Sequence, residues 1–171
     1  MGSEMCIRDR VESAEFTFRR AREADRTYLQ RLNFLADSFG DETADLEPDV
    51  LPGVEKYVDD WDPERDGGVI AFDELRTPAG GVWLRYWSKP EDGWANLGPD
   101  VPEIAIAVEN RYAGQRLGAQ LLGQAVQLAR EQGATRIALW VDAKNPRARH
   151  RYEEFGFTDH PTIEGAMVYA L

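Results

Sequence analysis

A short glycine-containing turn in the middle of the chain has the composition of an anion-binding site. It reads Gly114-Gln115-Arg116-Leu117-Gly118 and lies between a strand-like run and a long helix-like run. The first amides of a helix have no partner within the helix, and together with the helix dipole they favour an anion such as a pyrophosphate. Glycine allows a ligand to approach the backbone closely. The turn therefore predicts a phosphate site at a helix start, with Arg111 and Arg116 as cationic contacts.

On these residues alone, a tight strand-to-helix turn with solvated arginines is the simpler interpretation. The elements around the turn change this balance. Before it, Ile104, Ile106 and Val108 alternate with alanines, which is typical of a strand buried on both faces. After it, apolar residues recur with the helical period over residues 117–129, and Gly133 suits the end of that helix.

A second strand and a second helix complete this region. Residues 136–142 alternate apolar side chains between two faces, as a strand does. Asn145 followed by Pro146 then has the form of an N-cap with proline at the first helical position. Residues 101–157 are thus predicted to form a strand–helix–strand–helix unit.

With these elements in this order, the chain resembles the GCN5-related N-acetyltransferase (GNAT) family. The family's coenzyme A loop reads (Q/R)-x-x-G-x-(G/A); Gly118 matches it, whereas Ala113 and Arg116 replace the usual glutamine or arginine and the usual glycine. A second family pattern, N-x-x-A-x-x-x-Y-x-x-x-G-F, is matched at every fixed position by Asn145, Ala148, Tyr152, Gly156 and Phe157. The resemblance is strongest over residues 101–157 and less specific over residues 16–100.

This resemblance implies an α/β (α+β) fold. We expect a mixed, mostly antiparallel central sheet of six to seven strands, flanked by about four helices, with a splayed strand pair at the cofactor site. Residues 16–19 and a helix from about residue 25 to a stop at Gly40 fit the opening strand and helix. Residues 68–74 and 81–89 are predicted to form a hairpin around a turn at residues 77–80, and Phe157 with residues 166–170 the closing strands.

The resemblance also implies the reaction, in which an amine attacks the thioester of acetyl-CoA directly. No protein nucleophile is then needed, and the chain has neither a GxSxG elbow nor a GxxxxGK[ST] loop. Acetyl-CoA is the expected cosubstrate, with its pantetheine arm paired to the backbone of Ile106, Ala107 and Val108 like an extra strand. The other expected coenzyme contacts are Arg111, Ala113, Gly114, Gln115, Arg116, Leu117, Gly118, Ala119, Asn145 and Arg149.

Two residues are candidates for proton transfer. Glu103, at the start of the first strand of this region, is the expected base for the protonated amine, acting directly or through water. Tyr152 is the expected acid for the departing thiolate by its place in the family pattern. An exposed acid at a strand end and a packing tyrosine are the simpler alternatives, and capping alone explains Asn145 nearly as well. His150 is read as solvated surface.

Residues 37–66 hold twelve acids and two bases, and so ten of the eleven net negative charges of the chain. In proteins that this chain resembles, this region walls the acceptor site. A negative field there would concentrate a cationic acceptor, although an acidic surface that aids solubility explains the composition equally well. Phe39, Trp83 and Trp87 are candidate substrate contacts, while core packing is the alternative for the tryptophans.

Length and composition limit the remaining possibilities. With 171 residues the chain suits one N-acetyltransferase domain over residues 16–171, and we interpret residues 1–15 as a disordered or tag- and adapter-derived tail. The single Cys6 excludes a disulfide framework, and with His150 and His160 it gives no metal site. No apolar run approaches the length of a membrane span, and the sequence shows no secretory signal, which favours a cytoplasmic protein.

The partners follow from charge and from the resemblance. A net charge of −11 argues against nucleic-acid binding. We expect a small-molecule or peptide amine as the acceptor, and a homodimer is possible. A different class of function stays open, because the departures at Ala113 and Arg116 also suit a degenerate GNAT fold. Such a protein would bind coenzyme A or a partner protein without catalysis.

Overall fold

The computed structural model describes residues 15–171. The interpretation of the first residues as a tail, and Cys6 with it, lies outside the described residues except at Glu15. Seven strands form one sheet in the order β1-β2-β3-β4-β5-β7-β6. Their bounds are β1 Thr17–Arg20, β2 Gly68–Phe72, β3 Pro78–Arg85, β4 Glu103–Val108, β5 Arg136–Trp140, β6 Thr158–Asp159 and β7 Ala166–Ala170. All neighbours are antiparallel except β4 and β5, so the predicted mixed, mostly antiparallel sheet is confirmed.

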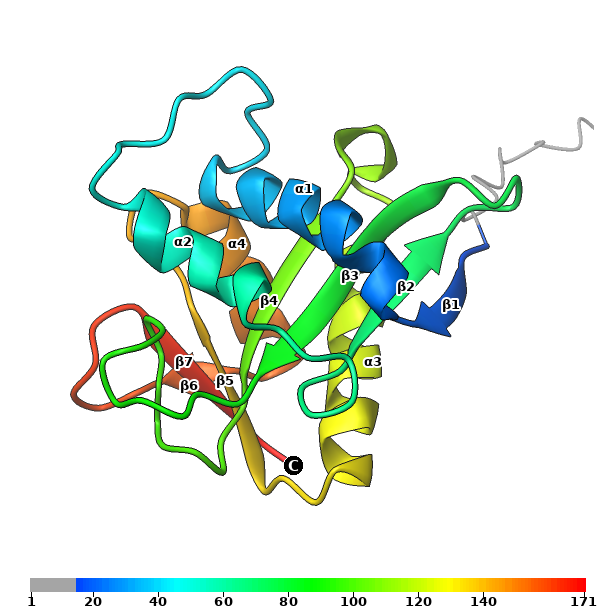
Figure 1. The fold of residues 1–171 in the computed structure, drawn as a ribbon. Coiled ribbons are helices and arrows are strands. Elements are labelled where there is room, and N and C mark those ends of the chain that lie inside the picture. Colours follow the sequence, from blue (N-terminus) through cyan, green and yellow to red (C-terminus); the bar gives the residue numbers. More distant parts are fainter. Residues whose placement is uncertain (1–14) are drawn as a thin grey trace, which may run out of the picture.

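Four α-helices cover the two faces of this sheet (Figure 1). Helices α1 (Arg26–Asp37) and α2 (Leu51–Asp59) lie on one face, and α3 (Leu117–Glu131) and α4 (Pro146–Phe155) lie on the other. Side chains of β4 point alternately to the two faces of the sheet and pack with both helix layers. Ile104 packs with the α3 leucines, while Ala105 and Ala107 pack with α1. No helix within residues 15–171 has the length and hydropathy needed to cross a membrane.

The predicted hairpin is present, but its turn lies earlier in the chain than expected. Residues 78–80 belong to β3, and the turn is formed by residues 73–77. The Asp73 side chain explains the shift, because its Oδ1 accepts the amides of Leu75 and Thr77 at 2.9 and 2.8 Å. Pro78 then occupies the first position of a strand, where the missing N–H is tolerated. The second strand also ends at Arg85 and not at residue 89.

Strands β4 and β5 are the splayed pair that the resemblance implies. Their register contains the single pair Glu103–Ala138, and the Ala138 amide donates to the Pro102 carbonyl at 3.0 Å. Beyond this point the strands separate, and α3 and α4 begin just after their carboxyl ends. The sheet thus opens toward the starts of two helices.

Candidate active site

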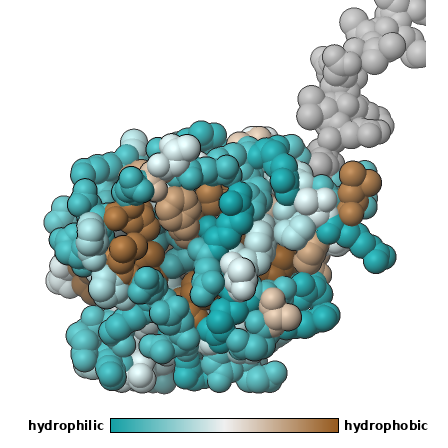
Figure 2. Space-filling model, turned by 45° about the horizontal axis from the view of Figure 1, so that its top comes forward, coloured by the Kyte–Doolittle hydropathy of each residue, from teal (hydrophilic) through white to brown (hydrophobic). Residues whose placement is uncertain are grey.

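A cavity of about 760 Å³ occupies the opening between β4 and β5. Its lining comes from residues 104–108 of β4, residues 139–142 in and after β5, the end of α1, Tyr57 of α2, and the starts of α3 and α4. The surface seen from the top of Figure 1 is mostly hydrophilic, with a group of hydrophobic residues on one side (Figure 2). A cavity with apolar walls and a few polar groups is the usual form of a small-molecule site.

The start of α3 offers free backbone amides to this cavity. Among the described residues, no backbone acceptor is paired with the amides of Leu117, Gly118 or Ala119. A Cβ atom built on Gly114 or Gly118 would meet no atom within 4 Å, so the turn leaves open space for a ligand. The geometry that the sequence predicts for an anion site is therefore present.

Arg116 adopts a left-handed conformation at the N-cap of α3, with φ 59°. Left-handed backbone disfavours side chains and favours glycine. This explains why glycine is usual at this position in the family that the chain resembles. It also shows that Arg116 adopts this conformation at a cost in free energy.

Two arginines that the sequence reasoning missed lie at the same turn. Arg147 and Arg151 of α4, together with Arg116, line a smaller cavity of about 140 Å³ at the head of α3. Both also line the main cavity. The sequence contains a signal for this pair, because Arg147 and Arg151 are four residues apart and therefore share one face of a helix.

Two predicted coenzyme contacts point elsewhere. The Arg111 guanidinium donates to the Pro78 carbonyl at 2.9 Å, and neither cavity is lined by it. The Arg149 guanidinium forms ion pairs with Glu153, at 3.3 Å, and with Asp159. Arg149 is two positions from Arg147 and from Arg151, which turns it to the other side of α4. Arg111 and Arg149 thus lie outside the lining of both cavities, and their contact with the coenzyme stays a prediction.

The remaining predicted coenzyme residues mostly surround the two cavities. The main cavity is lined by Ile106, Ala107, Val108, Gly114, Gly118, Ala119 and Asn145, and the smaller one by Ala113 and Leu117. Gln115 lines neither, and its buried Oε1 has no partner among the described residues. Asn145 caps α4, since its Oδ1 accepts the Ala148 amide at 3.3 Å.

Glu103 is buried, so the interpretation as an exposed acid at a strand end is wrong. Its Oε1 accepts the Ala95 amide at 2.8 Å and the Trp87 indole N–H at 3.2 Å, and its Oε2 accepts the Tyr57 hydroxyl. Burial raises the pKa of the Glu103 carboxyl, and these hydrogen bonds oppose the shift. Glu103 lines the cavity at the point where the strands begin to part.

Tyr57 is the nearest functional group to Glu103, and sequence reasoning did not single it out. Its hydroxyl donates to Glu103 and accepts the Trp94 amide at 2.9 Å, and its ring lies edge-on to Trp87 at 5.0 Å. Burial raises the pKa of the Tyr57 phenol well above its ordinary value, and the charges of Glu103 and Asp37 act in the same direction. The phenol therefore stays protonated and available as a donor.

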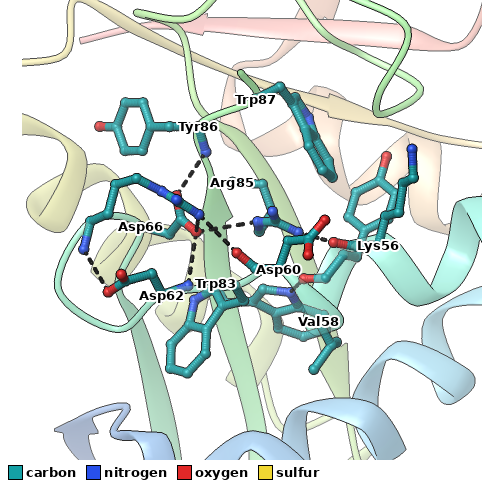
Figure 3. Close-up of polar contacts among 12 residues, drawn as sticks. Lys56, Val58, Asp60, Asp62, Asp66, Trp83, Arg85, Tyr86 and Trp87 are labelled. Atoms are coloured by element: carbon teal, nitrogen blue, oxygen red, sulfur yellow. Dashed lines mark hydrogen bonds and ion pairs between the residues drawn. The ribbon is translucent and has the colours of Figure 1, made fainter. Parts of the chain in front are cut away.

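A buried ion pair between Arg85 and Asp66 lies next to the end of α2 and helps to hold it in place (Figure 3). The Arg85 guanidinium lies 3.3 Å from Asp66 Oδ2 and donates to the Lys56 carbonyl, one residue before Tyr57. The indole N–H of Trp83 donates to the Tyr57 carbonyl at 2.9 Å. These contacts fix the end of α2 from which the Tyr57 side chain projects.

Tyr152 lines the cavity from α4, and its ring packs on Phe157 with centroids 6.1 Å apart. No described residue is hydrogen-bonded to its hydroxyl. Burial raises the pKa of the Tyr152 phenol to about 12. A protonated phenol facing a cavity is chemically suited to donate a proton there.

The three candidate substrate contacts differ in whether they line the cavity. Phe39 lines the cavity at the end of α1, in a left-handed conformation with φ 54°. Trp83 is fully buried against α1 and does not line the cavity, and Trp87 reaches it only through its hydrogen bond to Glu103. Core packing is thus the correct interpretation of Trp83. The exposed aromatic walls are instead Trp94 and Trp140, with ring centroids 6.1 Å apart.

Eleven of the twelve acidic residues of the 37–66 segment do not line the cavity, and several of these form contacts elsewhere. Asp66 pairs with Arg85, Glu42 pairs with Arg31 at 2.9 Å, and Asp62 accepts the amides of Glu64 and Arg65. Of the twelve acids in this segment, Asp37 is the one that lines the cavity. A contribution of the segment to acceptor binding would therefore act through Asp37 directly.

These features, an open parallel strand pair ending at a free helix start, match a known family. Residues 28–157 match the model of the acetyltransferase (GNAT) family. The chain belongs to this family.

Individual curated proteins that are named acetyltransferases match smaller parts of the chain. A mycothiol acetyltransferase of Beutenbergia cavernae is 31% identical over 104 residues, which are 53% of this chain and 35% of that protein. A putative [ribosomal protein bS18]-alanine N-acetyltransferase of Bacillus subtilis is 41% identical over 51 residues, 30% of this chain and 34% of that protein. The chain thus spans about a third of the length of these curated relatives.

Solved structures share the fold. A GNAT-family acetyltransferase of Staphylococcus aureus Mu50 has a TM-score of 0.67 at 14% identity and covers 92% of this chain and 99% of its own. The spermidine/spermine N-acetyltransferase SpeG of Vibrio cholerae has a TM-score of 0.58 at 19% identity and covers 91% of this chain and 92% of its own.

Proposed function

We propose that this protein transfers an acetyl group from acetyl-CoA to a primary amine. The observation that carries the proposal is the separation of β4 from β5 after Glu103, which joins the free amides of α3 to a buried carboxylate within one cavity. The acceptor is a small-molecule or peptide amine, and the acidic lining residue Asp37 favours a cationic one.

The residues present fit acetyl-CoA. The amides of Leu117, Gly118 and Ala119 would hold the diphosphate, and the side chains of Arg116, Arg147 and Arg151 would neutralise it. The edge of β4 that faces away from β3 lacks a strand partner beyond Glu103, so residues 106–108 can hydrogen-bond the pantetheine amides. The thioester would then lie between the starts of β4 and α4.

Glu103 and Tyr152 are the two titratable groups that transfer protons in this proposal. Glu103 accepts a proton from the attacking amine, directly, through water or through the Tyr57 hydroxyl, and its raised pKa suits a base. The amine nitrogen bonds to the carbonyl carbon, the carbon–sulfur bond breaks, and the Tyr152 hydroxyl gives its proton to the sulfur. The second proton lost by the nitrogen passes through solvent and restores the Tyr152 phenol. The products are an acetamide and the free coenzyme A thiol.

Thiol release tests this proposal. The purified chain is incubated with acetyl-CoA and a panel of amines, with product masses recorded, and Glu103→Gln serves as the variant lacking the base. We expect amine-dependent thiol release that the variant largely loses. Absence of both heat and thermal shift on titration with acetyl-CoA would refute the proposal. Coenzyme binding without acetylation of any amine would support the catalytically degenerate alternative.

A further inference from the structure

Asp37 is an unpartnered carboxylate in the wall of the cavity. Four acids line this cavity, Asp37, Glu103, Asp142 and Glu154. Glu103 accepts three hydrogen bonds, Asp142 Oδ1 accepts the Lys144 amide at 2.8 Å, and Glu154 pairs with His150 at 3.1 Å. Within residues 15–171, the Asp37 carboxylate forms no hydrogen bond or ion pair, and the residue is half-buried. The carboxylate is therefore free to bind a group that enters the cavity.

The local fold gives no reason for an acid at this position. Asp37 is the last residue of α1, and a negative charge at the carboxyl end of a helix interacts unfavourably with the helix dipole. Burial raises the pKa of the Asp37 carboxyl to about 6, with no compensating cation. The carboxylate thus opposes folding in both respects, which is typical of groups retained for binding.

The position of Asp37 is nevertheless fixed. The Arg31 guanidinium, earlier in α1, binds Glu109 beyond β4 at 2.8 Å, and the Asn110 amide group donates to the Gly40 carbonyl at 2.8 Å. Asn33 ties α1 to α2 by donating to the Val54 carbonyl at 2.8 Å. The end of α1 is held on both sides of Asp37, so the backbone that carries this side chain into the cavity wall is fixed.

The basic residues among the described cavity lining lie at α3 and α4, where Asp142 and Glu154 also lie. They are Arg116 at the N-cap of α3 and Arg147 and Arg151 of α4. Asp37 lies on α1 instead. Near Asp37 the lining contains Tyr57 and Phe39, and Trp94 and Trp140 are further aromatic walls. Aromatic faces next to a carboxylate suit an organic cation with an apolar spacer.

We propose that Asp37 binds a second ammonium group of the acceptor, so that the acceptor is a diamine. This inference rests on the proposed function, because Glu103 with Tyr57 receives the reacting nitrogen. Asp37 and Glu103 line the same cavity, so one acceptor can reach both carboxylates. A monoamine would leave Asp37 without its partner.

A comparison of matched amines tests the inference. Acetylation of diaminobutane, butylamine and aminobutanoate is measured with the parent chain, Asp37→Asn, Asp37→Glu and the control Asp45→Asn. Asp45 is an exposed acid of the same segment, so its variant makes the same change in net charge away from the cavity. We expect the parent and the control to favour diaminobutane over butylamine by about tenfold in kcat/KM. Asp37→Asn should lose this preference, and Asp37→Glu should retain part of it.

Separate measurements test the stability of Asp37→Asn and the case in which no amine is acetylated. Asp37→Asn should raise the melting temperature of the free chain near neutral pH, because it removes a half-buried charge that has no partner within residues 15–171; a fall would overturn the inference. Equal preference in the parent and in Asp37→Asn would also overturn it, while acetylation of butylamine would leave the proposed function intact. Should no amine be acetylated, the proposed function fails, and calorimetric titration of diaminobutane into the coenzyme A-saturated chains decides. Binding by the parent but not by Asp37→Asn supports the inference, and equal binding overturns it.

Discussion

The Tyr57 hydroxyl on α2 donates a hydrogen bond to Oε2 of Glu103 on β4, across 46 residues of sequence. The same hydroxyl accepts the Trp94 amide, while Oε1 of Glu103 accepts the next amide, that of Ala95. A helix, a strand and the loop before that strand therefore meet at one carboxylate. The surroundings of the proposed base are therefore formed by tertiary contacts.

Removing this hydrogen bond should shift the pH profile of the reaction. In Tyr57→Phe, ionised Glu103 loses a donor, so its pKa rises further. Because the base must be ionised to act, the acidic limb of kcat/KM should move to higher pH. The variant should also lose about 1–3 kcal/mol of unfolding free energy, because a buried oxygen is left unsatisfied. Rate–pH profiles and denaturant titrations measure the two effects.

Tyr28→Phe is the matched control for this experiment. The Tyr28 hydroxyl also donates to a glutamate, Glu109 Oε1 at 3.1 Å, but it does not line the cavity. Its loss should lower stability without moving the acidic limb. Identical limbs in the parent and Tyr57→Phe would contradict a role for Glu103 as the base.

Tyr152→Phe should lower turnover far more than it weakens coenzyme binding. The proposed proton is donated only as the carbon–sulfur bond breaks, so its loss affects the transition state and not the bound ground state. We expect kcat to fall by about 10- to 100-fold while the Kd of acetyl-CoA stays within about twofold. Steady-state rates and calorimetry check this. Tyr169→Phe, which changes a packing tyrosine outside the cavity lining, should leave kcat unchanged.

Arg151→Gln should weaken recognition of the diphosphate. Loss of one charge-assisted contact should raise the KM of acetyl-CoA about tenfold, and the defect should disappear with S-acetylpantetheine, which carries no diphosphate. Arg149→Gln, on the other side of α4, should behave as the parent. An equal defect with both thioesters would show that Arg151 acts on another part of the ligand.

Arg116→Gly and Arg116→Ala separate strain from charge at the head of α3. Both variants remove the guanidinium, but only glycine relieves the left-handed conformation at φ 59°. The glycine variant should therefore be more stable than the alanine variant by about 1 kcal/mol, with equal losses in coenzyme affinity. Melting curves and calorimetric titrations measure this pair. Equal stability of the two variants would argue against strain at this residue.

Arg85→Met should destabilise the fold strongly. It leaves the buried Asp66 carboxylate without the Arg85 cation and removes the contact to the Lys56 carbonyl (Figure 3). Breaking one side of a buried pair costs about 3–5 kcal/mol. Arg65→Met removes an exposed arginine from the same carboxylate and should cost less than about 1 kcal/mol. Chemical unfolding of the two variants gives the comparison.

Features encoded within one element could be predicted from the sequence. The turn before α3, the Asn145 cap and the face of α4 that carries Tyr152 each depend on neighbouring residues, and the structure has them. Glu103 was located from its place at the start of a strand, although its burial was not foreseen. Its buried surroundings come from α2 and residues 94–95, which no local pattern connects to β4.

The differences between the sequence predictions and the structure have equally specific causes. The sequence predicts Arg149 as a coenzyme contact and does not single out Arg147 and Arg151, because packing sets the rotation of α4 relative to α3. Trp83 is a predicted substrate contact with core packing as the alternative, because strand alternation does not reveal which face carries α2. The hairpin turn is predicted at residues 77–80, whereas the Asp73 side chain stabilises a turn at residues 73–77.

The parting of β4 from β5 leaves a row of main-chain groups in the middle of the sheet without a neighbouring strand. A cosubstrate seated there would serve as the missing strand, and its affinity would add to the free energy of folding as its concentration rises above Kd. Amide hydrogen exchange along residues 104–108 would then slow with coenzyme level, so that this protein's resistance to unfolding would vary with the supply of its own acetyl donor.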